Sequence, residues 1–254
     1  MKARSQSFST PKKPSSRVSP KRAAEGWTRA RVLGELKKLA NPQVRAKMAY
    51  FGVKVPNAHG IPQPVLHALA RHIGKNHKLA EQLWASGIHE ARILATLLGE
   101  AEKVTAGQME RWAQEFDSWD VVDAACCYLY AGAAPAWRQV EAWSRRREEF
   151  VKRAAFSLVA YLSYKDKQAS DARFERFLRV IEGEARDERN FVRKAVNWAL
   201  RNIGKRNLRL NRSAIRAAER IRRQDSRSAR WIAADALREL RSEAVQRRLR
   251  RKAG

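Results

Sequence analysis

Four segments of the sequence share a basic residue followed by small apolar residues at helical spacing: EARILATLL (90–98), VKRAAFSLV (151–159), VRKAVNWALRNI (192–203) and ARWIAADALREL (229–240). Apolar residues three and four positions apart line one face of a helix. With a further apolar helix predicted at 119–130, the segments start roughly every 30 to 41 residues, a period typical of stacked helical units. No alternating strand pattern with turn signals accompanies them. The pattern predicts an all-α chain.

This spacing fits helix-pair repeats of the HEAT kind, in which each pair of helices buries its apolar face only against its neighbours. Stacked pairs of this kind form a curved solenoid, and the second helix of each pair lines the concave side. We therefore expect a curved solenoid of HEAT-like helix-pair repeats with a concave basic groove. An irregular helical bundle is the alternative that the pattern leaves open.

The charge of the chain indicates a polyanionic partner. The chain contains 53 Lys and Arg residues but only 26 Asp and Glu residues, which gives a net charge of +27. A field of this sign and size favours nucleic acid. A membrane surface is the second candidate, but no apolar run approaches the roughly 20 residues of a spanning helix. We therefore expect nucleic acid as the partner and no membrane.

The two ends of the chain differ in composition. Residues 1–24 contain seven Lys or Arg, six Ser, three Pro and no acid, so they are predicted to be a disordered basic tail, with a transit peptide as the alternative. Residues 25–254 are predicted to form one domain. It should begin with a helix capped by Thr28, and a new helix should start near Pro64 after the Pro- and Gly-rich segment 53–64.

Motifs for metals, cofactors and disulfides are missing. Cys126 and Cys127 are adjacent on a predicted helix, where neighbouring side chains point about 100° apart, so a disulfide between them would be severely strained. Free cysteines suit a reducing cytoplasm. The five histidines have no Cys or Asp at ligand spacing, and no GxSxG, HExxH or Gly-rich phosphate loop occurs. We therefore expect no metal and no cofactor.

The segment SWDVVDAACCYLY, residues 118–130, carries the most unusual combination of side chains. On an ideal helix its buried stripe consists of Val122, Ala125, Cys126 and Leu129. Trp119 and Asp123 share a different face, which Cys127 and Tyr130 continue. Because a carboxylate in a positive groove repels phosphate, binding alone gives no reason for Asp123 to lie there. A capping or solvated acid, and a core aromatic, are the alternative interpretations.

If the second helices line one surface, an acid, two indoles and a row of cations converge on it. They are Trp119, Asp123, Lys152, Arg153, Arg193, Lys194 and Trp198. Asp120 fits the first helical turn, where a carboxylate complements the helix dipole. The cations could equally be an ordinary solvated face. Their combination with one acid and two indoles favours a site that acts on nucleic acid.

Three segments resemble a known family: FDSWDVVDAA (116–125), FVKRAAFSLVAYLSYK (150–165) and NFVRKAVNWALRNIGKRN (190–207). They are similar to the bacterial DNA alkylation repair glycosylases of the AlkD type, and the resemblance extends over roughly residues 28–240. It implies excision of purines alkylated at N3 or N7, such as 3-methyladenine and 7-methylguanine, as the first step of base excision repair. It also implies a monomer that binds duplex DNA carrying alkylated purines in the bacterial cytoplasm, at the nucleoid.

Through this resemblance four residues receive catalytic roles: Trp119, Asp123, Arg153 and Trp198. Arg201 matches a residue that touches the DNA backbone, and the basic row adds Lys152, Arg193 and Lys194 as expected DNA-binding residues. One position departs from the family, because its tyrosine near the N-terminal helix pair falls near Gln43 here.

The chemistry explains why such a site needs an acid. A cationic purine leaves readily, while the sugar becomes oxocarbenium-like as the glycosidic bond stretches. A carboxylate 4 Å away at an effective dielectric of 20 is worth up to about 4 kcal/mol, or roughly a thousandfold in rate. Asp123 is expected to supply this charge, Trp119 and Trp198 to wall the sugar, and Arg153 to hold a phosphate. A non-catalytic HEAT-repeat protein that binds damaged or distorted nucleic acid, and a protein–protein scaffold, are the alternatives.

Overall fold

The computed structural model of the chain describes residues 26–53 and 56–253, so the predicted N-terminal tail lies outside the described residues. The described part is all-α and contains no strand. Its α-helices are α2 (Arg29–Lys38), α3 (Pro42–Tyr50), α4 (Gln63–Ile73), α5 (His77–Trp84), α6 (His89–Leu98), α7 (Ala106–Gln114), α8 (Trp119–Ala124), α9 (Ala136–Trp143), α10 (Glu149–Lys165), α11 (Asp171–Glu184), α12 (Asn190–Gly204), α13 (Leu208–Arg222), α14 (Arg227–Leu240) and α15 (Glu243–Ala253).

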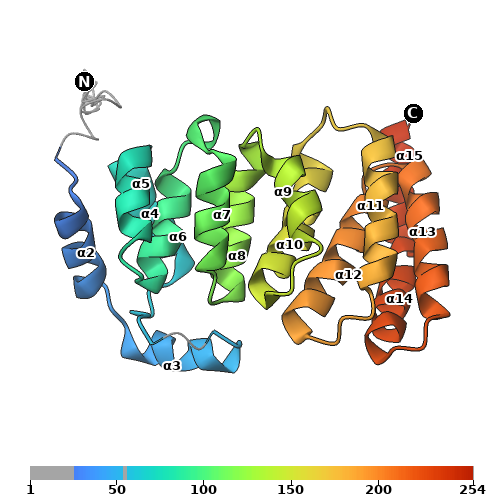
Figure 1. The fold of residues 1–254 in the computed structure, drawn as a ribbon, viewed down its shortest axis with the longest axis horizontal. Helices are drawn as coiled ribbons and strands as arrows, with labels where there is room; N and C mark the ends of the chain where they lie inside the picture. Colours follow the sequence, from blue (N-terminus) through green and yellow to red (C-terminus); the bar gives the residue numbers. More distant parts are fainter. Residues whose placement is uncertain (1–25, 54–55, 254) are drawn as a thin grey trace, which may run out of the picture.

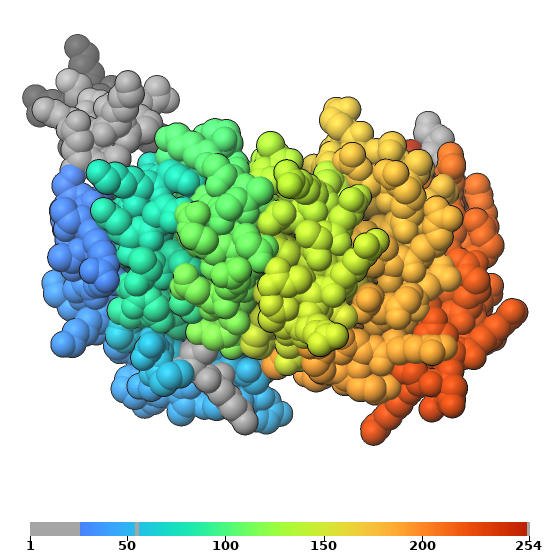
Figure 2. All heavy atoms as spheres, viewed as in Figure 1, coloured from blue at the N-terminus to red at the C-terminus, as the bar shows by residue number. Residues whose placement is uncertain are grey.

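The helices stand side by side in a row that follows the sequence from blue to red (Figure 1). The predicted apolar segments form α6, α8, α10, α12 and α14, and successive members of this set pack on one another. A connected core of buried side chains runs from Val32 to Leu240. Figure 2 shows side chains filling the space between neighbouring helices along the row. The prediction of stacked HEAT-like helix pairs is confirmed.

Local signals in the sequence set several helix boundaries. The Thr28 side chain accepts a hydrogen bond from the backbone N–H of Arg31 at 3.3 Å and caps α2, as expected. Helix α4 begins at Gln63, next to the predicted Pro64. Helix α10 lies in the middle of the row and is buried on most sides, which its many alanine and serine residues permit because small side chains let neighbouring helices approach closely.

Helix α8 does not continue as the regular helix expected over 119–130. It passes into a π-helical turn at Ala125–Leu129. The predicted stripe is buried, but Tyr130, expected on the face of Trp119 and Asp123, is fully buried between Trp112 and Trp143. That expectation was wrong, because a π turn takes one more residue per hydrogen-bonded turn and rotates everything after it.

Helix α3 differs from the others, because none of its nine residues is buried. It lies across the lower edge of the row in Figure 1. The loop that follows α3 is held by the buried Glu90 carboxylate. This carboxylate accepts hydrogen bonds from the backbone N–H of His59 at 2.8 Å and of Gly60 at 2.6 Å. Gly60 has φ +78°, and a Cβ there would lie 2.3 Å from the backbone oxygen of Asn41. The position of α3 therefore depends on these loop contacts and not on an apolar face.

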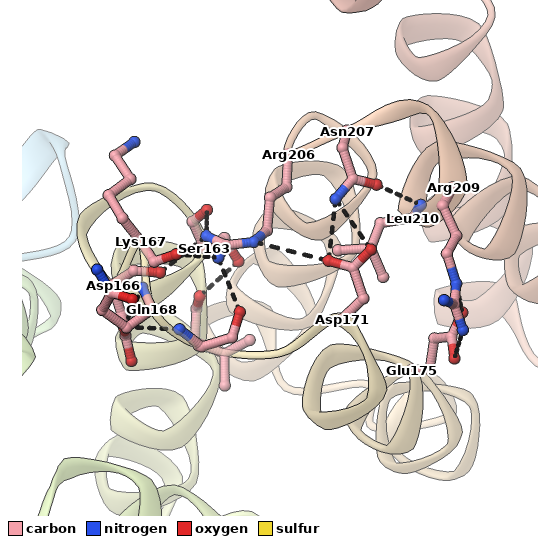
Figure 3. Close-up of polar contacts among 12 residues, drawn as sticks. Ser163, Asp166, Lys167, Gln168, Asp171, Glu175, Arg206, Asn207, Arg209 and Leu210 are labelled. Atoms are coloured by element: carbon pink, nitrogen blue, oxygen red, sulfur yellow. Dashed lines mark hydrogen bonds and ion pairs between the residues drawn. The ribbon is translucent and has the colours of Figure 1, made fainter. Parts of the chain in front are cut away.

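The carboxyl end of α10 is closed by one arginine (Figure 3). The Arg206 guanidinium donates to the carbonyl oxygens of Ser163 at 3.0 Å, Asp166 at 2.9 Å and Ala169 at 2.9 Å. It also lies 4.7 Å from the ring centroid of Phe174. A cation at this position satisfies carbonyl groups that the end of a helix leaves without partners, and it ties the turn after α12 to α10.

None of the described helices is long and apolar enough to cross a bilayer.

Candidate functional site

One face of three neighbouring helices brings the acid and the indoles together. Helix α8 carries Trp119 and Asp123 one turn apart, α10 carries Arg153 and further polar residues at successive turns, and α12 carries Trp198. Trp119, Asp123 and Arg153 lie in one cluster, because the Arg153 guanidinium contacts both of the others. Trp198 lies next to Tyr161 of α10, with 4.9 Å between the centroids of the two rings. We call this set, together with Ser157, the acid cluster.

The Asp123 carboxylate is fixed by two hydrogen bonds from α10. Its Oδ2 accepts from Arg153 Nη2 at 2.7 Å, and its Oδ1 accepts from Ser157 Oγ at 2.9 Å. Its side chain keeps 17% of its surface exposed. Burial raises the pKa of Asp123 above its ordinary value, and Arg153 and Ser157 only partly oppose this effect. The arrangement holds a carboxylate at a set position with one side toward solvent.

Arg153 is directed into the protein. Its side chain is 7% exposed, and Nη1 donates to the Phe191 carbonyl oxygen at 2.9 Å while Nη2 bonds to Asp123. The sequence predicted that Arg153 holds a DNA phosphate, and in this structure both terminal nitrogens already have partners. Arg153 therefore orients Asp123 and links α10 to the start of α12.

Trp119 is held by a contact that joins distant parts of the chain. Its indole N–H donates to the Phe51 carbonyl oxygen at 3.0 Å, which connects α8 to the turn after α3. Its ring also contacts α10, because the Arg153 guanidinium carbon lies 5.9 Å from the centroid of the Trp119 ring. The indole is partly exposed beside Asp123, as the prediction of a wall requires.

Ser157 and Tyr161 are members of the cluster that the sequence reading missed. They follow Arg153 at four-residue steps along α10, so they lie on its face toward Asp123. Burial raises the pKa of the Tyr161 hydroxyl, and the nearby Asp123 carboxylate raises it further. The hydroxyl is therefore neutral at physiological pH. The i, i+4, i+8 spacing from Arg153 is the signal that could have found both residues.

The predicted DNA-binding cations have different surroundings. The Lys152 side chain is 12% exposed, and its ammonium group pairs with Glu184 at 2.5 Å and Asp187 at 3.6 Å. It would have to give up both partners to bind a phosphate. Arg201 pairs with Glu239 at 2.8 Å and Asp235 at 3.2 Å.

Arg193 and Lys194 lie closer to solvent. The Arg193 guanidinium carbon is 4.8 Å from the ring centroid of Trp231, an exposed tryptophan of α14. Lys194 is exposed. These two cations are the members of the predicted row that remain best placed for contact with a phosphate backbone.

A second group of cations lines a cleft of about 410 Å³ at the carboxyl ends of α10 and α12. Its cations are Lys167, Lys205, Arg206, Arg248 and Lys252, and no Asp or Glu is among its described lining residues. Burial lowers the pKa of Lys252, and the neighbouring cations lower it further. In Figure 3 the Lys167 ammonium points away from the contacts around Arg206. Binding of an anion would relieve this repulsion, so we call the site the basic cleft.

Among the described residues, no group of three or more His, Cys, Asp or Glu side chains is placed to bind a metal ion. His89, the most deeply buried histidine, pairs with Asp120 at 2.9 Å instead. Asp120 was expected only to complement the helix dipole.

Comparison with known proteins relates this geometry to a family. A family model described as DNA alkylation repair enzyme matches residues 32–240. A solved structure, described as a new family of proteins related to the HEAT-like repeat DNA glycosylases with affinity for branched DNA structures, is similar with a TM-score of 0.71 at 18% sequence identity. The match covers 84% of this chain and 96% of that chain. The search of curated proteins gives no match.

Proposed function

The chain belongs to the family of DNA alkylation repair enzymes, and from this premise we propose that it is a DNA glycosylase that excises cationic N3- or N7-alkylated purines. The observation that carries the proposal is the Asp123 carboxylate, held by Arg153 and Ser157 beside a partly exposed tryptophan. A protein that only binds DNA gains nothing from a fixed negative charge on its binding face.

The proposed reaction is hydrolysis of the N-glycosidic bond. The bond between C1′ and the purine nitrogen breaks, and its electron pair leaves with the base, which becomes neutral. Positive charge develops on the sugar, where the Asp123 carboxylate stabilises it. Water adds to C1′ and releases a proton, which gives an abasic site and a free alkylpurine. No acid is needed to protonate the leaving base, because the alkyl group already makes it cationic.

The other members of the acid cluster serve this carboxylate. Arg153 and Ser157 fix its position, which spares reorganisation when charge develops. Trp119 and Trp198 offer aromatic faces to a cationic base or sugar, an attraction of about 2 kcal/mol when water is excluded. The neutral Tyr161 hydroxyl adds no charge that would compete with Asp123. Arg193, Lys194 and the cleft residues Lys167, Arg248 and Lys252 supply cations for duplex phosphates. In the same cleft Lys205 pairs with Glu239, and Arg206 donates to carbonyl oxygens.

The proposal is tested by incubating the full chain with a duplex that carries one 7-methylguanine. We expect release of free 7-methylguanine and formation of an abasic site, with no release from the unmethylated duplex. Products are separated by chromatography, and the abasic site is cleaved with alkali. Binding of the duplex without any release would contradict catalysis.

That outcome would favour the second candidate, a non-catalytic protein for damaged or distorted DNA. Affinity for branched DNA is a property of the similar solved structure. The cations of the basic cleft, at the carboxyl ends of α10 and α12, would serve such binding without any role for Asp123.

The pH dependence of excision should report the ionisation of the Asp123 carboxyl group. Only its ionised form stabilises the sugar cation, so kcat/KM is expected to fall as pH falls through the pKa of the free enzyme. Burial raises that pKa, so the fall should begin above the ordinary aspartate value of about 3.9. The measurement is initial excision from pH 8 to about 4, corrected for depurination without enzyme. A flat profile over this range would exclude a titrating Asp123.

A further inference from the structure

A groove on the outer side of the array lies between α9 and α11, the first helices of two successive pairs. Its volume is about 500 Å³, and Trp137, Phe177 and Val180 give it an apolar floor. The acid cluster lies on α8, α10 and α12, which are second helices of their pairs. Because first and second helices form separate layers in such an array, the two sites occupy different layers. We call this site the outer groove.

The outer groove carries a concentrated positive charge. Glu141 is the one acid among its described lining residues, and four arginines line it: Arg138, Arg145, Arg173 and Arg176. Arginines on neighbouring elements pair with carboxylates, as Arg146 does with Glu110 at 2.7 Å. Within residues 26–53 and 56–253, no carboxylate lies at ion-pair distance from the four groove arginines. The groove therefore presents cationic donors that the fold itself does not use.

The next groove along the array shows that this charge is not a general property of the repeat. It lies between α11 and α13 and is lined by three arginines and two glutamates. These glutamates have partners, since Glu182 pairs with Arg220 at 2.5 Å and Glu175 with Arg209 at 3.1 Å. When α9 and α11 are matched by their buried positions, Trp137 and Ser144 stand where α11 has these two acids. The outer groove thus replaces paired carboxylates with an aromatic ring and a small residue.

Trp137 is held in place and is covered by an arginine. Its indole N–H donates to the Asp166 carboxylate at 2.9 Å, and its ring centroid lies 5.3 Å from that of Phe174. The Arg173 guanidinium carbon lies 5.0 Å from the Trp137 ring centroid. A guanidinium stacked on a fixed ring is oriented to bind a carboxylate through two parallel hydrogen bonds. A nucleic-acid base would have to displace Arg173 to stack on this ring.

We propose that the outer groove binds an acidic peptide segment of a partner protein, with a bulky apolar side chain on the floor and carboxylates on the arginines. A phosphate backbone would use the cations but not the apolar floor. A second copy of this chain, with a net charge of +27, would be repelled. The inference goes beyond the proposed function, because α9 and α11 carry no member of the acid cluster. A partner held here leaves that cluster open to DNA.

The experiment uses the full chain and a fluorescein-labelled peptide of Asp and Glu residues around a central Leu-Phe pair. Fluorescence anisotropy at physiological salt should show saturable binding. Arg138→Glu/Arg176→Glu should weaken it at least about tenfold, because charge-assisted contacts become repulsive. A peptide with two glycines in place of Leu-Phe should also bind at least about tenfold more weakly, because the floor stays unfilled. Both arginines are exposed, so the melting temperature of the double variant should not fall.

Arg179→Glu/Arg216→Glu is the matched control, since it makes the same change of net charge in the groove between α11 and α13. It should keep the peptide affinity within about twofold, because salt screens exposed charges at a distance. Equal losses in the two double variants would overturn the proposal, and so would full affinity of the glycine peptide. An oligothymidine that displaces the peptide, and binds Arg138→Glu/Arg176→Glu as weakly as the peptide does, would assign the groove to nucleic acid instead.

Discussion

Asp123→Asn is expected to lower the single-turnover rate of excision by about two to three orders of magnitude. The amide keeps the shape of the side chain and an oxygen for the Arg153 guanidinium, but it removes the negative charge that meets the sugar cation. Duplex affinity should stay the same or tighten slightly, because an anion has left a positive surface. The two quantities are measured by rapid quench with excess enzyme and by fluorescence anisotropy.

Ser157→Ala provides the matched control for Asp123→Asn. It removes the hydrogen bond to Oδ1 and leaves the charge and the Arg153 contact in place. We expect it to lose much less activity than Asp123→Asn. The catalytic assignment fails if Asp123→Asn excises within about twofold of the wild type, since the charge alone should account for roughly a hundredfold or more.

Arg153→Met should destabilise the protein by about 3–5 kcal/mol, because it leaves a buried carboxylate without its cation. Urea unfolding monitored by tryptophan fluorescence measures this loss. Duplex affinity should change little, since Arg153 is almost fully buried and its terminal nitrogens bond within the protein. A large loss of affinity with normal stability would instead restore the phosphate contact that the sequence predicted.

The pH dependence of Arg153→Met gives a second signature. Without Arg153 the pKa of Asp123 should rise further, because burial already raises it and the main opposing charge is gone. The folded protein then binds a proton that the unfolded chain has released, so stability falls as pH rises from the unfolded pKa to the folded one. Excision should rise over the same interval, as Asp123 ionises. Arg153→Lys keeps a cation and should show both effects weakly.

The sequence predicted those features that depend on neighbouring residues along one helix. The Thr28 cap was predicted from the residue type before the first helical position, and the shared face of Trp119 and Asp123 from their four-residue spacing. In the structure Thr28 caps α2, and the Arg153 guanidinium contacts both Trp119 and Asp123. Tyr130 was assigned to the wrong face because nothing in its apolar surroundings distinguishes a π turn from a regular one.

Contacts between distant segments could not be predicted in the same way. Phe51 and Trp119 are 68 residues apart, and their hydrogen bond uses a backbone carbonyl, for which the sequence carries no signal. The acid partners of Lys152 come from the next helix pair, so its charge looked free in the sequence. Periodicity describes one helix, whereas the availability of a charge depends on which helices pack together.

The acid cluster draws its members from three helices that pack on one another in turn, with Asp123 on α8, Arg153 on α10 and Trp198 on α12. In a stacked array each repeat contacts only its neighbours, so small rotations between repeats add up along its length. A change in the rotation between these repeats would therefore change the spacing of the three side chains. If a bound duplex altered that rotation, the stiffness of the stacked repeats would become part of what sets the rate of the proposed reaction.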